Sequence, residues 1–86
     1  MLTQSQVEAK VKSLLAVTLC VDEKIITGEK YLKDDLGMDS FDEIMLVTGI
    51  EDEFGFDIDD DMFFDLKTVE EVNNYVNNLV VQKQPA

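Results

Sequence analysis

The sequence predicts an all-α protein with four helical segments, of which the third is short. Apolar residues recur at intervals of three and four along most of the chain, which is the spacing of one face of an α-helix. Two of these apolar series are preceded by residue pairs typical of a helical capping box. With 86 residues and 45% hydrophobic content, the chain is expected to form one small globular domain.

The first helix is expected over about residues 3–18, followed by a long loop over residues 21–38. Thr3 and Gln6 match a capping box, and one helical face holds Val7, Val11, Leu14, Leu15 and Leu19. We expect Cys20, at the end of this helix, to be a half-buried apolar residue. The apolar residues that can hold the loop on a core are Ile25, Ile26, Tyr31, Leu32 and Leu36. A loop of this length in a small domain usually has a function.

The second helix begins around Ser40 and is apolar on two faces. At ~100° per residue, one face holds Leu46, Val47, Ile50 and Phe54, and the other holds Phe41, Ile44, Met45 and Thr48. One core cannot bury both faces, so the second face either packs between other helices or meets a partner. The acids that border this face, Asp42, Glu51 and Asp52, either suit docking onto a basic surface or are a solvated helix face. Gly49 marks either a close backbone approach or a locally soft helix.

Two more helical segments complete the prediction. One or two helical turns are expected between Asp59 and Asp65, with acids at their N-terminal end. A second capping box, Thr68 and Glu71, precedes the last helix, whose apolar positions are Val69, Val72, Val76, Leu79 and Val80. We expect a single domain over residues 1–86, with a frayed tail at about residues 82–86.

The strong negative charge of the chain and its lack of histidine exclude several classes of function. The chain has 19 acidic residues, 7 lysines and no histidine, for a net charge of -12. Fifteen of the acids and only one lysine lie in residues 34–71. Such a surface repels nucleic-acid phosphates and anionic lipids and attracts basic protein surfaces. Without histidine, Ser–His–Asp and Cys–His catalytic arrangements and ordinary zinc sites are excluded, so we expect the chain not to be an enzyme.

The sequence also bears on location. No apolar stretch approaches the ~18 residues of a membrane span, and the first residues do not resemble a signal peptide. Small secreted domains usually carry several cysteines, whereas this chain has one. We therefore expect a cytoplasmic protein that does not insert into membranes. We also expect it to be a monomer.

The segment before the second helix, Asp35 to Phe41, has the sequence Asp-Leu-Gly-Met-Asp-Ser-Phe. Gly37 permits a positive φ, and either Asp39 or Ser40 can cap the helix, Ser40 in a capping box with Glu43. A serine in this position is usually only a cap. A phosphate ester on the Ser40 hydroxyl would, however, lie beside free N–H groups at the positive end of the helix dipole.

This segment resembles the attachment loop of acyl carrier proteins, whose pattern is Asp-Leu-Gly-any-Asp-Ser-Leu. Similarity continues through residues 51–55, Ile58 and residues 68–72, so it covers nearly the whole chain. The resemblance implies a four-helix bundle whose serine carries a covalent 4′-phosphopantetheine arm, with an acyl group held on the arm as a thioester. Ser40 would then be the attachment site, and Asp39 would help a phosphopantetheinyl transferase and its metal engage the loop.

The same resemblance implies that the second helix meets the transferase and the acyl-transfer or synthase enzymes. Its acidic docking positions would be Asp42, Glu51 and Asp52, around the apolar Phe41, Ile44, Met45 and Thr48. The sequence departs from the family pattern where Phe41 replaces leucine, Met45 stands at a common glutamate and Asp59 follows Ile58 in place of proline. We expect a carrier for fatty-acid or related biosynthesis, with a D-alanyl, other aminoacyl or polyketide carrier as the alternative.

Two other classes of function fit less well. Asp57, Asp59 and Asp61 mimic the first ligands of an EF-hand loop, but Met62 occupies the glycine position and Thr68 that of the bidentate glutamate. No dedicated metal site is therefore expected. An acidic inhibitor that mimics nucleic acid would need acids over much of its surface, whereas here they are concentrated in the middle of the chain.

Overall fold

The computed structural model describes residues 2–83 and contains four α-helices and one short 3-10 helix, η1. Their bounds are α1 Gln4–Leu19, η1 Glu23–Ile25, α2 Ser40–Phe54, α3 Asp60–Phe64 and α4 Val69–Lys83. The all-α prediction with a short third helix is confirmed. Of the predicted tail, residues 82 and 83 belong to α4, and residues 84–86 lie outside the described residues.

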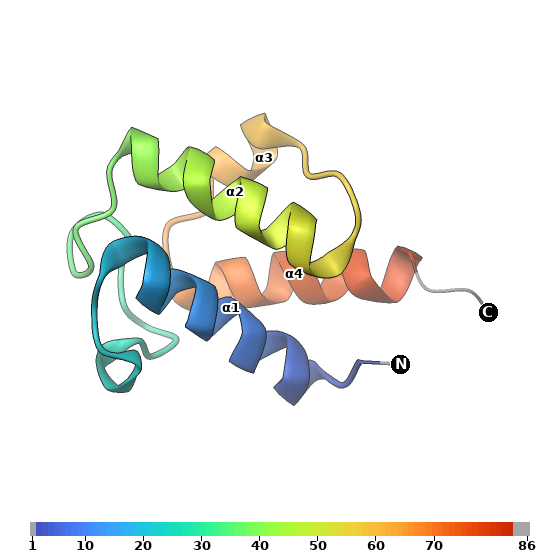
Figure 1. The fold of residues 1–86 in the computed structure, drawn as a ribbon, viewed down its shortest axis with the longest axis horizontal. Helices are drawn as coiled ribbons and strands as arrows, with labels where there is room; N and C mark the ends of the chain where they lie inside the picture. The colour runs from blue at the N-terminus through green and yellow to red at the C-terminus, as the bar shows by residue number, and fades with distance from the viewer. Residues whose placement is uncertain (1, 84–86) are drawn as a thin grey trace.

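The helices pack as a small bundle around α1 (Figure 1). Helix α1 packs against both α2 and α4, and the short α3 contacts α2. The beginning of α1 and the end of α4 lie at one end of the bundle, and the long loop between α1 and α2 wraps around the other (Figure 1). The loop therefore delivers the start of α2 to the end of the molecule opposite the beginning of α1.

The core is built from the apolar faces that the sequence predicts. The four α-helices and the long loop contribute fully buried side chains, among them Leu15, Ile26, Leu32, Leu46, Ile50, Phe63 and Val76. Burying one such side chain contributes about 1.5–3 kcal/mol relative to leaving it exposed. Ile26, Leu32 and Leu36 hold the loop on this core as expected, whereas Ile25 and Tyr31 are exposed, so those two predictions are wrong.

Both predicted capping boxes are present. The Thr3 hydroxyl accepts a hydrogen bond from the Gln6 backbone N–H at 3.2 Å, and the Thr3 N–H donates to Gln6 Oε1 at 2.8 Å. Thr68 and Glu71 make the equivalent pair at the start of α4, both at 3.2 Å. These side chains satisfy N–H groups that a helix cannot pair internally, and so they fix where α1 and α4 begin.

The end of α1 differs from the prediction. Cys20 follows the helix in a left-handed conformation with φ 57° and ψ 45°, and its side chain is exposed. The prediction that Cys20 is half-buried is therefore wrong, because the left-handed residue turns the chain out of the helical stripe that packs on the core. Few residues other than glycine adopt this backbone conformation without an energetic cost.

Gly49 lies where α1 and α2 approach each other. A Cβ atom added at Gly49 would lie 3.3 Å from Leu14 Cδ2 on α1. Of the two explanations that the sequence allows for this glycine, a close approach and a locally soft helix, the structure supports the close approach. The absence of a side chain at this position lets the two helices pack closely.

The long loop is tied to the beginning of α4 by backbone hydrogen bonds. Leu32 N–H donates to Lys67 O at 2.8 Å, and Tyr31 and Thr68 form an isolated antiparallel bridge. Two further bonds run from the first turn of α4 to the carbonyl groups of Lys30 and Gly28, at 3.0 and 2.9 Å. The loop is thus fixed at both the core and α4 before it enters α2.

Candidate functional site

A tight turn over residues 31–38 leads into α2. Gly37 has φ 74°, a left-handed conformation that favours glycine, and its N–H donates to Lys33 O at 3.1 Å. Met38 N–H donates to Leu32 O at 2.9 Å, which closes the turn. Leu36 and Met38 are buried on either side of the glycine. These contacts fix the position of Asp39 and Ser40 at the surface.

Asp39 is the N-cap of α2. Its Oδ1 accepts a hydrogen bond from Asp42 N–H at 2.8 Å, and Asp42 Oδ2 accepts one from Asp39 N–H at 3.2 Å. Of the two caps that the sequence allows, the structure therefore has Asp39, in a capping box with Asp42 instead of one between Ser40 and Glu43. Because Asp39 caps the helix, the Ser40 hydroxyl is not needed for that purpose.

Ser40 is the first residue of α2, and it is exposed. Its hydroxyl takes part in none of the hydrogen bonds found within residues 2–83. The N–H groups of Ser40 and Phe41 belong to the first turn, where a helix has no internal acceptor for them. A phosphate ester on Ser40 would thus meet unpaired donors and the positive end of a helix dipole, so the residues present fit a phosphopantetheine arm.

Glu43 also belongs to this turn, and the sequence analysis did not assign it to the functional site. It is the only charged residue among the buried residues of the described chain, with 5% of its surface exposed. Its carboxylate pairs with the Lys33 ammonium at 3.2 Å. The helical spacing does give a signal, because Glu43 lies three, four and seven residues before the buried Leu46, Val47 and Ile50 and so belongs to the inward face.

The outer face of α2 presents the apolar residues that the sequence predicts. Phe41, Ile44 and Met45 are 69%, 57% and 51% exposed, and Thr48 is exposed as well. On the opposite face, Leu46, Val47 and Ile50 are buried and Phe54 is half-buried.

Helix α3 extends this face with Phe64, which the sequence analysis did not assign to it. Met62 is 57% and Phe64 41% exposed, while Phe63 between them is buried. Ile44 and Phe64 line one shallow hollow of about 170 Å³ between α2 and α3. The outer patch is therefore defined by Phe41, Ile44, Met45 and Phe64.

The three acids predicted to border the outer patch differ in their surroundings. Asp42 is half-buried in the capping box, and Glu51 is half-buried with its Oε2 accepting a hydrogen bond from Ile58 N–H at 2.9 Å. Asp52 is exposed, and no hydrogen bond or ion pair within the described residues engages its carboxylate. Two of the three acids thus support the backbone, and the third is free for a partner.

The aspartates that mimic an EF-hand loop have a different arrangement. Asp59 Oδ1 caps α3 by accepting hydrogen bonds from Asp61 N–H at 3.0 Å and Met62 N–H at 3.3 Å. Across residues 2–83, no three histidine, cysteine, aspartate or glutamate side chains lie in a group that could hold a metal ion. No helix of the described chain has the length and apolar character needed to cross a membrane.

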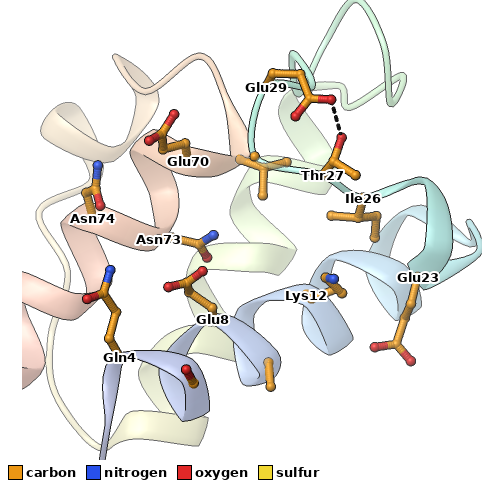
Figure 2. A pocket seen from close by; sticks show the side chains of 14 residues that line it. Gln4, Glu8, Lys12, Glu23, Ile26, Thr27, Glu29, Glu70, Asn73 and Asn74 are labelled. Carbon is orange, nitrogen blue, oxygen red and sulfur yellow. Dashed lines mark hydrogen bonds between the residues drawn. The ribbon is translucent and has the colours of Figure 1, made fainter.

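A separate hollow lies away from Ser40, between α1, residues 26–29 and α4 (Figure 2). It has a volume of about 690 Å³ and a lining that is as much apolar as polar, with Glu8 of α1 and Asn73 of α4 facing each other across it (Figure 2). The Glu29 backbone N–H, and then the Thr27 hydroxyl at 2.8 Å, lower the pKa of the Glu29 carboxyl at its rim. No residue of α2 lines this hollow, so it is separate from the attachment loop.

Comparison with known proteins agrees with the geometry of the loop and α2. The family model described as "Phosphopantetheine attachment site" matches residues 9–76. An acyl carrier protein from Thermosynechococcus vestitus is 38% identical over 79 residues, which cover 92% of this chain and 98% of that protein. A solved structure of a candidate acyl carrier protein from Mycobacterium tuberculosis superposes with a TM-score of 0.79 at 33% identity, covering 85% of this chain and 97% of that one. The chain therefore belongs to the acyl carrier protein family, whose members bear phosphopantetheine and are carriers and not enzymes.

Proposed function

We propose that Ser40 bears the phosphopantetheine arm and that the chain carries acyl groups for fatty-acid or related acyl-chain biosynthesis. The observation that supports this assignment is the Ser40 hydroxyl itself, exposed at the first position of α2 and released from capping by Asp39. Asp39 uses Oδ1 for the cap, and its Oδ2 has no hydrogen bond within the described residues, so that oxygen is available to a metal ion of the transferase.

In this proposal the outer patch meets the basic surfaces of partner enzymes. Desolvating large apolar side chains at the centre of an interface contributes most of the affinity, while charges at the rim steer the encounter. Asp52 is placed for steering, and Asp42, Glu51 and Thr48 lie beside the patch in α2. The chain would act as a single monomeric domain, in the cytoplasm, where its exposed thiol at Cys20 stays reduced.

The assignment of Ser40 is tested by incubating the protein with a phosphopantetheinyl transferase, coenzyme A and magnesium and measuring its intact mass. We expect the wild-type protein to gain one arm and Ser40→Ala to gain none. Ser13→Ala is the matched control, because Ser13 is an exposed helical serine on α1, and this variant should be modified like the wild type. Modification of Ser40→Ala would end the assignment.

A further inference from the structure

The attachment loop and the first turn of α2 are joined by one ion pair, between Lys33 and Glu43. The two atoms, Lys33 Nζ and Glu43 Oε1, lie 3.2 Å apart. The two side chains have opposite surroundings: that of Glu43 is 7% exposed and that of Lys33 is 64% exposed. A buried carboxylate is costly unless it is paired, so Glu43 holds the Lys33 ammonium while most of the Lys33 side chain stays in water.

This ion pair places a cation close to Ser40. Glu43 follows Ser40 by three residues in the same helix, and side chains three apart are neighbours on the helix surface, with Cβ atoms about 5–6 Å apart. An ammonium paired with Glu43 therefore lies beside the first turn of α2, the turn that also holds Ser40. The Lys33 ammonium has three N–H donors, and none of the hydrogen bonds found within residues 2–83 uses them, so they are open to an added anion.

The Lys33 ammonium lies next to a segment of the chain that is otherwise strongly acidic. Residues 34–66 hold 13 acidic residues and no lysine, so Lys33 is the lysine nearest to Ser40 in sequence as well as the one fixed to its helix. Asp39 and Asp42 lie in the same turn, and their carboxylates oppose an added anion. A phosphodiester on Ser40 adds one more negative charge to this turn.

We infer that the Lys33 ammonium, held by the buried Glu43 carboxylate, is the cationic contact of the phosphodiester that joins the arm to Ser40. Glu43 is then a positioning residue that acts through Lys33. The contact offsets the repulsion from Asp39 and Asp42 and orients the first atoms of the arm along α2. This inference rests on the proposed attachment at Ser40.

The test is competitive acetylation of lysines in the apo and holo proteins, with thiols alkylated beforehand and labelling quantified for each lysine by peptide mass spectrometry. Only the uncharged amine reacts, and one negative charge about 6 Å away in water lowers that fraction about threefold. We expect labelling of Lys33 to fall about threefold in the holo protein at low salt. Lys24, exposed in η1, is the internal control and should label equally in both forms.

Two further comparisons separate a charge contact from simple coverage by the arm. In 1 M NaCl the screening length is about 3 Å, so the protection of Lys33 should disappear. In the holo form of Glu43→Gln, Lys33 is no longer held at the first turn, and its protection at low salt should be smaller than in the wild type. A role of Glu43 in stability alone would lower the melting temperature and leave this protection unchanged.

Failure of this inference can be told apart from failure of the proposed function. The intact mass, measured first, reports whether the arm is present on the protein. Equal labelling of Lys33 in apo and arm-bearing protein would overturn the inference while the Ser40 assignment stands. Protection that persists in 1 M NaCl would also overturn it, since it would show coverage instead of charge pairing. If no arm is added at Ser40, both proposals fail together.

Discussion

At each end of α2, an acidic side chain accepts a hydrogen bond from the backbone. Asp42 completes the capping box with Asp39, and Glu51 binds the N–H of Ile58 in the segment that leads to α3. Charge-reversing substitutions at either position would therefore disturb the fold as well as any docking contact. Asp52, exposed and free of such contacts, separates the two effects.

We predict that Asp52→Lys slows modification by the transferase at low salt and leaves the melting temperature unchanged, because it reverses a long-range attraction and no hydrogen bond. Glu51→Ala should instead lower the stability of the fold. It leaves the part-buried Ile58 N–H without its acceptor and should cost about 1–3 kcal/mol of stability. Urea unfolding and the salt dependence of kcat/KM measure the two effects. If Asp52→Lys reacts as fast as wild type at low salt, Asp52 does not steer the encounter.

The residues that sequence could predict are those whose role depends on near neighbours. The exposed Ser40 follows from the local pattern of the loop, but whether Asp39 or Ser40 caps the helix does not, because both side chains can accept the same hydrogen bond. The pairing of Glu43 with Lys33 spans ten residues across a loop with no periodicity, so its geometry exists only in the folded chain.

At the scale of elements, α1 and α2 approach each other closely at Gly49. An added Cβ would lie 3.3 Å from Leu14 Cδ2, which is the end of a flexible, half-buried side chain. Glycine in a helix interior costs about 1 kcal/mol relative to alanine. Leu14 can move by a few tenths of an ångström, so the helical gain from alanine should exceed the cost of that movement.

We therefore predict that Gly49→Ala raises stability by about 0.5 kcal/mol. Gly49→Val should lower it, since two more carbons meet Leu14. Gly55→Ala is the control: Gly55 ends α2 with φ 77°, so alanine there should be destabilising by about 1 kcal/mol although nothing lies within 4 Å of the added atom. Loss of stability in Gly49→Ala, measured by urea unfolding, would show that Leu14 is rigidly packed.

The helices themselves are largely predictable, since capping boxes and apolar periodicity are local. Their contacts with the loop are not. The Tyr31–Thr68 bridge joins segments 37 residues apart, and nothing in the sequence of either segment specifies it. The apolar positions of the loop show the same limit: Ile25 and Ile26 are equally apolar, and only the 3-10 turn decides that Ile26 is buried and Ile25 exposed.

For the whole molecule, the net charge of -12 opposes compaction. Among the described residues, two lysines form ion pairs that reduce the repulsion locally. These pairs are Lys10 with Glu53 at 2.6 Å and Lys33 with Glu43. Most of the acids in residues 34–65 are exposed and have no cation beside them.

We predict that NaCl and millimolar MgCl₂ raise the melting temperature of the apo protein, because cations screen this repulsion. Since the described residues hold no cluster of three acids suited to a metal ion, calcium and magnesium should act alike at equal concentration. Circular dichroism during thermal unfolding measures this effect. No change with either salt would mean that the fold already relieves the repulsion, and a selective effect of calcium would point to a dedicated site.

The central claim, that this chain carries acyl groups on an arm at Ser40, is tested most directly by the intact mass of protein purified from its own host, before and after hydroxylamine. We predict a species with the arm and an acyl group, from which hydroxylamine removes only the acyl group because it cleaves thioesters. Fragmentation should place the remaining arm on the peptide that contains Ser40. A host-derived protein with the unmodified mass, or with the arm on another residue, would contradict the account.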